Sequence, residues 1–234
     1  FMMKEKNILI IGGSSGIGLA LAELLSVSNK VVVASRSGDS VANLDVQHIP
    51  FDATTDQLDV TLLPDTLHGF VYCPGSINLR PFKGLSPEAF EKDFQINVMG
   101  AINSLKAVLA PLSNSGSASV VFFSTVAVQT GMPFHSSVAS SKGAIEGLTR
   151  SLAAEFAPKI RVNAIAPSLV NTPLASKFLN NETKMEKANE RHPLGRVGSA
   201  KEIAQATAFL LGEESSWMTG RVLQLDGGIG NLKT

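Results

Sequence analysis

One glycine-rich turn constrains this chain more than any other feature of its sequence. An apolar run at residues 7–11 leads directly into Gly12-Gly13-Ser14-Ser15-Gly16-Ile17-Gly18, and the apolar residues of 16–25 have helical spacing. A strand, a tight glycine turn and a helix N-terminus in this order are typical of a dinucleotide-binding site, because free N–H groups and the positive end of the helix dipole face the pyrophosphate. We expect Gly12 to permit the turn, Gly16 to let the pyrophosphate approach and Gly18 to allow close packing of helix and strand. A tight turn before a buried helix, without a ligand, is the alternative.

The end of the second apolar run indicates which dinucleotide to expect. A carboxylate at this point would hold the ribose 2′-hydroxyl of NAD. The segment reads Val33-Ala34-Ser35-Arg36-Ser37 and has no carboxylate, whereas the Arg36 guanidinium can pair with a 2′-phosphate through two hydrogen bonds. The sequence therefore favours NADP(H) over NAD(H), with a solvated Arg36 in a turn as the alternative.

Apolar runs alternate with helix-like segments along the whole chain. Strands rich in Val, Ile and Leu between helices predict an α/β fold of the Rossmann-like, doubly wound kind, with about seven parallel strands and helices on both faces. No linker or repeat divides residues 1–234, so we expect one dinucleotide-binding domain. Residues 171–198 are polar, offer no charged cluster that names a ligand, and predict a substrate lid or small helical insertion. The expected strands are 7–11, 30–34, 47–51, 69–73, 120–123, 160–165 and 221–225, and the expected helices 16–25, 87–109, 139–156 and 200–211.

Composition argues against several classes of function. The 20 basic and 20 acidic residues give no formal net charge and form no basic stripe for nucleic acid. A single cysteine rules out an internal disulfide and fits a reducing compartment, and no apolar run approaches the ~20 residues of a membrane span. We expect a cytoplasmic protein that acts on a small molecule, without nucleic acid, membrane or metal.

Further motifs make the chain resemble the short-chain dehydrogenase/reductase family over nearly its whole length. They are Asn97-Val98-Met99-Gly100, Ala139-Ser140-Ser141-Lys142-Gly143, Asn163-Ala164-Ile165-Ala166-Pro167 and Asp226-Gly227-Gly228, besides the glycine turn. Residues 192–198 are similar to the 3-oxoacyl-carrier-protein reductase branch. The resemblance implies hydride transfer between the cofactor and a carbonyl or alcohol, and a homotetramer or homodimer. It also implies cofactor contacts from Gly12, Ser14, Ser15, Gly16, Ile17, Gly18, Ser35, Arg36, Asp52, Ala53, Pro74, Gly75, Lys142, Pro167, Ser168, Val170 and Thr172.

The family's catalytic groups are an asparagine, a serine, a tyrosine and a lysine. By resemblance, Asn97 and Lys142 are in place, the serine position is Thr125, and the tyrosine position four residues before Lys142 is Val138. Valine cannot donate the proton that a carbonyl oxygen takes up as hydride arrives. We predict His135 as the replacement, because an imidazole titrates near neutral pH and lies seven residues before Lys142, on a similar helical face. A role in flanking the helix is the alternative for His135.

Three functions remain open. The first is an oxidoreductase with a reassigned proton donor. The second is a catalytically silent relative that binds the dinucleotide as a sensor or scaffold. The third is an enoyl-type reductase, whose tyrosine has the offset of His135, although the glycine spacing here is that of ordinary family members. Two further expectations are that Tyr72, the only tyrosine, packs in the core, and that the short segment between residues 52 and 69 has a shortened or missing helix.

Overall fold

The first strand and helix form where the glycine turn predicts them. The computed structural model describes residues 3–232. Strand β1 (Asn7–Ile11) is buried over four of its five residues, and helix α1 (Gly16–Ser26) begins directly after the turn. Successive residues of β1 point to opposite faces of the sheet, so that Ile8 and Ile10 join one hydrophobic cluster and Leu9 and Ile11 the other. A strand that is apolar at four successive positions is therefore buried on both faces.

Seven parallel strands form the main sheet, in the order β3-β2-β1-β4-β5-β6-β9. The strand order reverses between β1 and β4, and in open parallel sheets ligands bind beyond the carboxyl ends of the strands at such a point. The expected Rossmann-like α/β fold is confirmed. The other strands are β2 (Lys30–Ser35), β3 (Val46–Pro50), β4 (Gly69–Tyr72), β5 (Ala118–Phe123), β6 (Ile160–Pro167) and β9 (Val222–Leu225).

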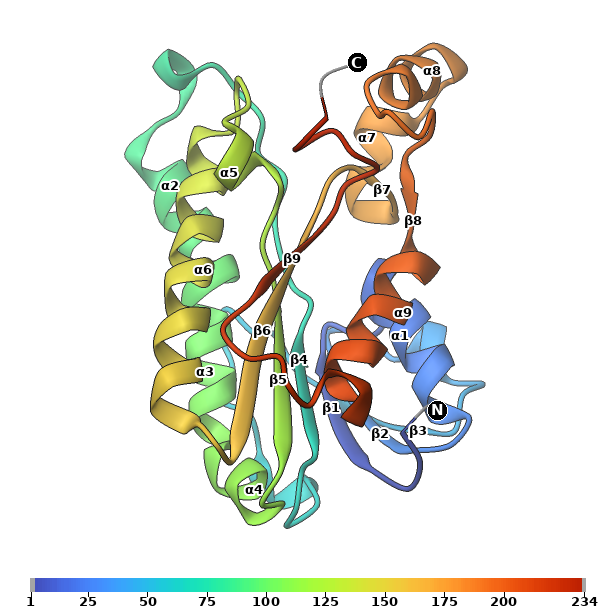
Figure 1. Ribbon diagram of the computed structural model, residues 1–234, viewed down its shortest axis with the longest axis vertical. Helices are drawn as coiled ribbons and strands as arrows, with labels where there is room; N and C mark the ends of the chain where they lie inside the picture. The colour runs from blue at the N-terminus through green and yellow to red at the C-terminus, as the bar shows by residue number, and fades with distance from the viewer. Residues whose placement is uncertain (1–2, 233–234) are drawn as a thin grey trace.

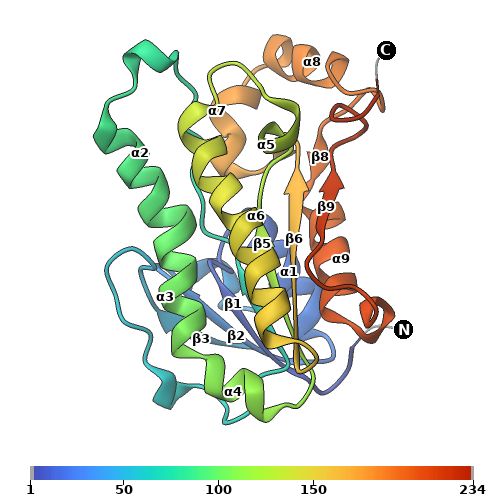
Figure 2. The same cartoon turned by 60° about the vertical axis from the view of Figure 1, so that its left-hand side comes forward.

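Helices cover both faces of this sheet (Figures 1 and 2). On one face α1 packs beside α9 (Ala200–Leu211), and their buried leucines, isoleucine and alanines share a cluster with β1 and β2. On the other face lie α2 (Pro87–Phe94), α3 (Gly100–Ala107) and the long α6 (Ser136–Phe156). Among residues 3–232, no helix has the combination of length and apolar character that crossing a membrane requires.

Two helices differ from their expected ranges. The helix expected over 87–109 contains a π-helical turn at Gln95–Met99 and ends at Ala107, and α4 (Leu109–Asn114) starts separately. The break occurs because Pro111 has no N–H for the Ala107 carbonyl and its ring crowds that carbonyl. The helix expected from residue 139 begins at Ser136, so that the first bond of α6 runs from the Ala139 N–H to the His135 carbonyl, 2.8 Å apart.

Two connections shape the carboxyl end of the sheet. Between β3 and β4 there is only a short 3₁₀ turn, Val60–Leu62, and no α-helix, as expected. After β6 the chain makes a small helical insertion, with α7 (Ser176–Leu179) and α8 (Glu182–Glu190) between the paired strands β7 (Val170–Asn171) and β8 (Gly198–Ser199). Figure 1 shows this insertion standing above the carboxyl ends of the strands, opposite α2 and the short helix α5 (Ala127–Thr130).

Candidate active site

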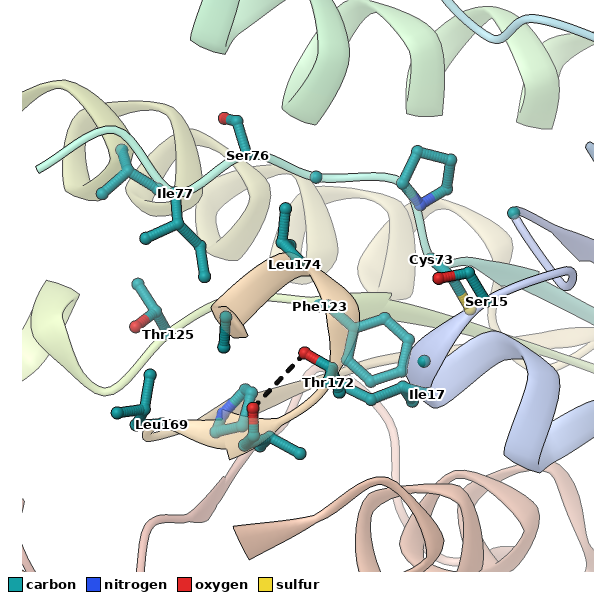
Figure 3. A pocket seen from close by; sticks show the side chains of 18 of the residues that line it. Ser15, Ile17, Cys73, Ser76, Ile77, Phe123, Thr125, Leu169, Thr172 and Leu174 are labelled. Atoms are coloured by element: carbon teal, nitrogen blue, oxygen red, sulfur yellow. Dashed lines mark hydrogen bonds between the residues drawn. The ribbon is translucent and has the colours of Figure 1, made fainter. Parts of the chain in front are cut away.

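A cleft of about 1290 Å³ opens at the carboxyl ends of the central strands. Its walls are the turn after β1, the ends of β2, β4 and β5, the start of α6 and the insertion after β6. Figure 3 shows Ser15 and Ile17 on the same side of the cleft as Cys73, with Thr125 and Leu169 across from them. Every residue that the sequence singled out for the cofactor lines this cleft, and so do Thr125, His135 and Lys142. Asn97 is buried beside the cleft rather than on its surface.

The glycine turn has the geometry that an anion site needs. Gly12 and Gly16 have φ of +77° and +53°, in the left-handed region that glycine adopts most readily. A Cβ at Gly18 would collide with the Gly12 carbonyl oxygen, and a Cβ at Gly16 would lie 3.3 Å from Thr172 Cβ. The first N–H groups of α1 have no acceptor within the helix and lie at the cleft wall. This end of the cleft can therefore accept a pyrophosphate, which favours a ligand site over a mere tight turn.

The end of β2 presents a cation and no carboxylate to the cleft. Ser35 is buried, and its hydroxyl donates to the Ser37 carbonyl over 2.9 Å, which fixes the turn. Arg36 is exposed at the cleft wall, whereas Asp39 does not line the cleft. Asp52 is the one carboxylate among the described residues that line the cleft. Hydrogen bonds from Thr54 lower the pKa of the Asp52 carboxyl, and the Arg36 charge acts in the same direction.

Lys142 lies at the centre of the site. Its side chain is buried, and the ammonium donates a hydrogen bond to the Phe123 carbonyl, 2.9 Å away at the end of β5. Burial lowers the pKa of Lys142 to about 8, while Cys73 and Asp93 act in the opposite direction. Val138, one helical turn earlier, is also buried and lines the cleft. An apolar side chain therefore occupies the position where the family resemblance places a phenol.

Two hydroxyl groups follow β5, and they have different partners. Ser124 is buried and donates to the Glu146 carboxylate over 2.8 Å. Thr125 accepts a long bond of 3.4 Å from the Ala127 N–H, and its hydroxyl proton has no acceptor among residues 3–232. Thr125 can therefore donate to a ligand oxygen, whereas Ser124 is committed to the core.

Asn97 occupies the π-helical turn between α2 and α3. Its amide donates to the hydroxyls of Ser76 and Ser141, at 2.9 and 3.0 Å, while its Oδ1 is buried without a partner in the described part of the chain. A Cβ added at Gly75 would lie 3.2 Å from this oxygen and 3.3 Å from Lys142 Nζ. Gly75 therefore keeps open a space between a buried acceptor and a buried cation. An orphaned buried acceptor of this kind calls for a ligand or water atom.

His135 is the N-cap residue of α6 and also lines the cleft. Its Nδ1 lies 2.8 Å from the Pro133 carbonyl oxygen, which requires a proton on Nδ1. Nε2 is thus the nitrogen that can exchange a proton with a ligand. The ring flanks the helix and lines the cleft at once, so its position is compatible with both roles that the sequence left open.

Asp93 is a buried carboxylate that the sequence analysis did not single out. It accepts hydrogen bonds from the hydroxyls of Ser76, at 2.6 Å, and Ser137, at 2.5 Å. Through Ser76 it connects to the Asn97 amide. The available signal was its position one helical turn before Asn97, on the buried side of the expected helix.

Tyr72 packs in the core and lies outside the cleft, as expected. Its hydroxyl donates to the Ile96 carbonyl over 2.6 Å, and burial raises its pKa. It therefore braces the π-helical turn that holds Asn97 and is no candidate for proton transfer. Among residues 3–232, no group of three or more His, Cys, Asp or Glu side chains is placed to hold a metal ion.

Known proteins resemble this chain over nearly its entire length. A family model described as enoyl-(acyl carrier protein) reductase matches residues 12–230. A 2,5-dichloro-2,5-cyclohexadiene-1,4-diol dehydrogenase of Sphingobium indicum is 33% identical, with 97% of each chain covered. A short-chain dehydrogenase/reductase of Botryotinia fuckeliana is 34% identical, with 96% of each chain covered. The solved structure of an aldohexose dehydrogenase from Thermoplasma acidophilum superposes with a TM-score of 0.88 at 27% identity, covering 99% of this chain and 97% of the other.

Proposed function

The chain belongs to the short-chain dehydrogenase/reductase family, and from this premise we propose that it is an NADP(H)-dependent oxidoreductase whose proton donor is His135. The reaction is hydride transfer to or from a carbonyl or alcohol. The observation that carries the proposal is the arrangement around Lys142: a buried ammonium, a threonine hydroxyl with an unused proton, and a histidine with a free Nε2, all on one cleft.

The cleft fits a nicotinamide dinucleotide. The N-terminus of α1 would hold the pyrophosphate, Asp52 and Ala53 the adenine, and Thr172 the carboxamide of the nicotinamide. The open space at Gly75, between Asn97 Oδ1 and Lys142 Nζ, suits a ribose hydroxyl or a water molecule that donates to the amide oxygen and accepts from the ammonium. The bound cofactor supplies or accepts the hydride.

The choice of NADP(H) rests on charge at the end of β2. Arg36 is the charged side chain from this turn that lines the cleft, and it can form two parallel hydrogen bonds with a 2′-phosphate. The nearest carboxylate in the sequence, Asp39, accepts a hydrogen bond from Ser37 at 3.0 Å and does not line the cleft. It is thus not placed to hold the 2′-hydroxyl of NAD.

Each remaining group has one task in the proposed reaction. In reduction, Thr125 donates a hydrogen bond to the substrate carbonyl and orients it. The protonated His135 imidazole transfers its Nε2 proton to the carbonyl oxygen as hydride arrives at the carbon. Its Nδ1–H stays bonded to the Pro133 carbonyl and holds the ring in place. Lys142 holds the nicotinamide ribose, since valine at 138 leaves no phenol for the ammonium to activate.

Three further features complete the proposal. Residues 171–198 act as the substrate lid of a single domain, because α7 and α8 stand at the cleft. The protein assembles as a homodimer or homotetramer, as the family resemblance implies, and acts in the cytoplasm, which its single cysteine favours. The partner in the reaction is a small molecule.

Oxidation of NADPH with a panel of aldehydes and ketones tests the proposal. We expect wild-type turnover that His135→Gln lowers about 10²-fold, because a positioned general acid contributes at least this factor. NADPH affinity should not change. His68→Gln is the matched control, since His68 accepts from the Asn7 N–H at the far end of the sheet. Unchanged turnover in His135→Gln would reject His135 as donor. NADPH binding without any turnover would instead identify the silent binding protein.

A further inference from the structure

Helix α8 separates its charges onto two faces. Lys184, Lys187 and Arg191 follow one another at spacings of three and four residues, so they fall on one side of the helix, and all three line the cleft. The glutamates Glu182, Glu186 and Glu190 recur every four residues on the other side, and none of them lines the cleft. A chain without net charge thus directs a row of cations into its active-site cleft.

Helix α7 adds a fourth cation to this row. The Lys177 ammonium donates to the Ile77 carbonyl over 2.8 Å and lies 4.9 Å from the centroid of the Phe178 ring. The Lys184 ammonium donates to the Lys177 carbonyl and to Asn180 Oδ1, both at 2.9 Å. These bonds hold two of the four charges at the wall. We call Lys177, Lys184, Lys187 and Arg191 the cationic wall.

The cationic wall has no ion-pair partner in the part of the chain that the structure describes. Within residues 3–232, none of its four members lies within ion-pair distance of an acidic side chain, although Arg196, a few residues along, pairs with Glu202 at 2.6 Å. Lys184 and Lys187, and Lys187 and Arg191, are like-charged neighbours on one helix face, an arrangement that destabilises a helix. An anion placed between these side chains would reduce this repulsion.

The cleft that the cationic wall lines also has apolar side chains in its lining. Ile77, Leu79, Met132 and Val138 line the cleft from other elements, and Leu174 and Phe178 line it from the insertion itself. Figure 3 labels Ile77, Leu174 and Thr125 among the side chains that line the cleft. Under the proposed function, the glycine turn and Arg36 hold the three phosphate groups of NADPH at the other end of the cleft. The cations of α7 and α8 are therefore left for the substrate.

We infer that the substrate is an apolar carbonyl or alcohol compound that carries an anionic group, a carboxylate or a phosphate, at the end remote from the reacting carbon. The anion binds the cationic wall at the cleft mouth, and the apolar body extends inward to Thr125 and Lys142. This inference rests on the proposed hydride transfer for the identity of the reacting end. The anion site itself stands on charge and geometry alone.

Anionic compounds and neutral counterparts of similar length test the anion site separately from the reacting end of the substrate. The NADPH-loaded protein is assayed with 7-oxooctanoate, its methyl ester, 7-oxooctyl phosphate and the neutral 2-octanone. Independently of turnover, calorimetry measures the binding of octanoate and of octanamide to the NADP⁺-loaded protein. The test variant is Lys187→Gln with Arg191→Gln. The control is Lys30→Gln with Lys159→Gln, which removes the same charge from exposed positions at the amino ends of β2 and β6.

We expect octanoate to bind at least tenfold more tightly than octanamide, with a preference that falls as salt rises. The test variant should lose that preference and raise the KM of the anionic ketones about tenfold, while the ester, 2-octanone and NADPH change less than twofold. Whichever anionic ketone reacts faster shows whether carboxylate or phosphate is preferred. Equal binding of octanoate and octanamide would overturn the inference, as would a loss of NADPH affinity in the test variant. Selective octanoate binding without any turnover would reject the proposed function and leave the anion site standing.

Discussion

Val138→Tyr should convert the site to a much faster carbonyl reductase. Val138 lies one helical turn before Lys142, and residues four apart on a helix have Cβ atoms about 5–6 Å from each other. A phenol at 138 would thus have its pKa lowered by the Lys142 ammonium, which burial already brings to a pKa of about 8. Val138 is buried but lines the cleft, so we expect the added ring to extend into the cleft.

The expected gain follows from what a general acid contributes. Proton donation is worth ~10²–10⁴-fold in rate, so kcat/KM for ketone reduction should rise by about 10² where His135 already supplies part of the effect. In a His135→Gln background, the gain in kcat/KM from Val138→Tyr should approach ~10⁴-fold, because the tyrosine and His135 are alternative donors for one proton transfer.

The assay is NADPH oxidation by wild type, Val138→Tyr and Val138→Phe, with NADPH affinity measured for each. Val138→Phe supplies the ring without the hydroxyl and controls for changed packing. If tyrosine is no better than phenylalanine while NADPH still binds, then Thr125 and Lys142 do not form a competent site, and the reasoning that links their positions to catalysis is refuted.

Three further substitutions test single elements of the structure. Gly18→Ala should abolish NADPH binding or lower the melting temperature, since its Cβ would meet the Gly12 carbonyl oxygen; calorimetry and thermal unfolding measure both. Tyr72→Phe should reduce the free energy of unfolding by about 0.5–1.5 kcal/mol in urea titrations, because the Ile96 carbonyl loses its donor. Lys142→Met removes the ammonium group whose pKa burial lowers from 10.5 to about 8. Between about pH 8 and pH 10.5, Lys142 is protonated in the unfolded chain and neutral in the folded protein. Wild type should therefore gain stability relative to the variant as pH rises from about 8 to about 10.5, by roughly 3 kcal/mol; no change would contradict the burial of the charge.

The sequence was sufficient for the sheet, for the glycine turn and for a set of proposed cofactor residues that the structure brings to one cleft. These features depend on local patterns: apolar strands, helical spacing and glycines at a fixed distance from a strand. The break at residues 107–109 was missed although Pro111 is visible in the sequence, because the apolar spacing continues across it. The early start of α6 was missed because the serines before residue 139 have no apolar periodicity.

The remaining features of the site depend on contacts between distant segments. In the sequence, Asp93 is one more polar residue of an amphipathic helix. In the fold, Ser76 and Ser137 from other elements donate hydrogen bonds to it. The sequence of residues 171–198 has no evident charged cluster, since the basic and acidic residues of α8 alternate along the chain. The cluster exists only once the helix forms and one face of it meets the cleft.

Binding of NADPH tests the proposed function most directly, and calorimetry with NADPH, NADH, NADP⁺ and NAD⁺ measures it. We predict micromolar binding of NADPH, markedly weaker binding of NADH, and loss of that preference in Arg36→Ala. Failure of all four dinucleotides to bind would contradict the central claim, because the glycine turn and the cleft would then serve no cofactor.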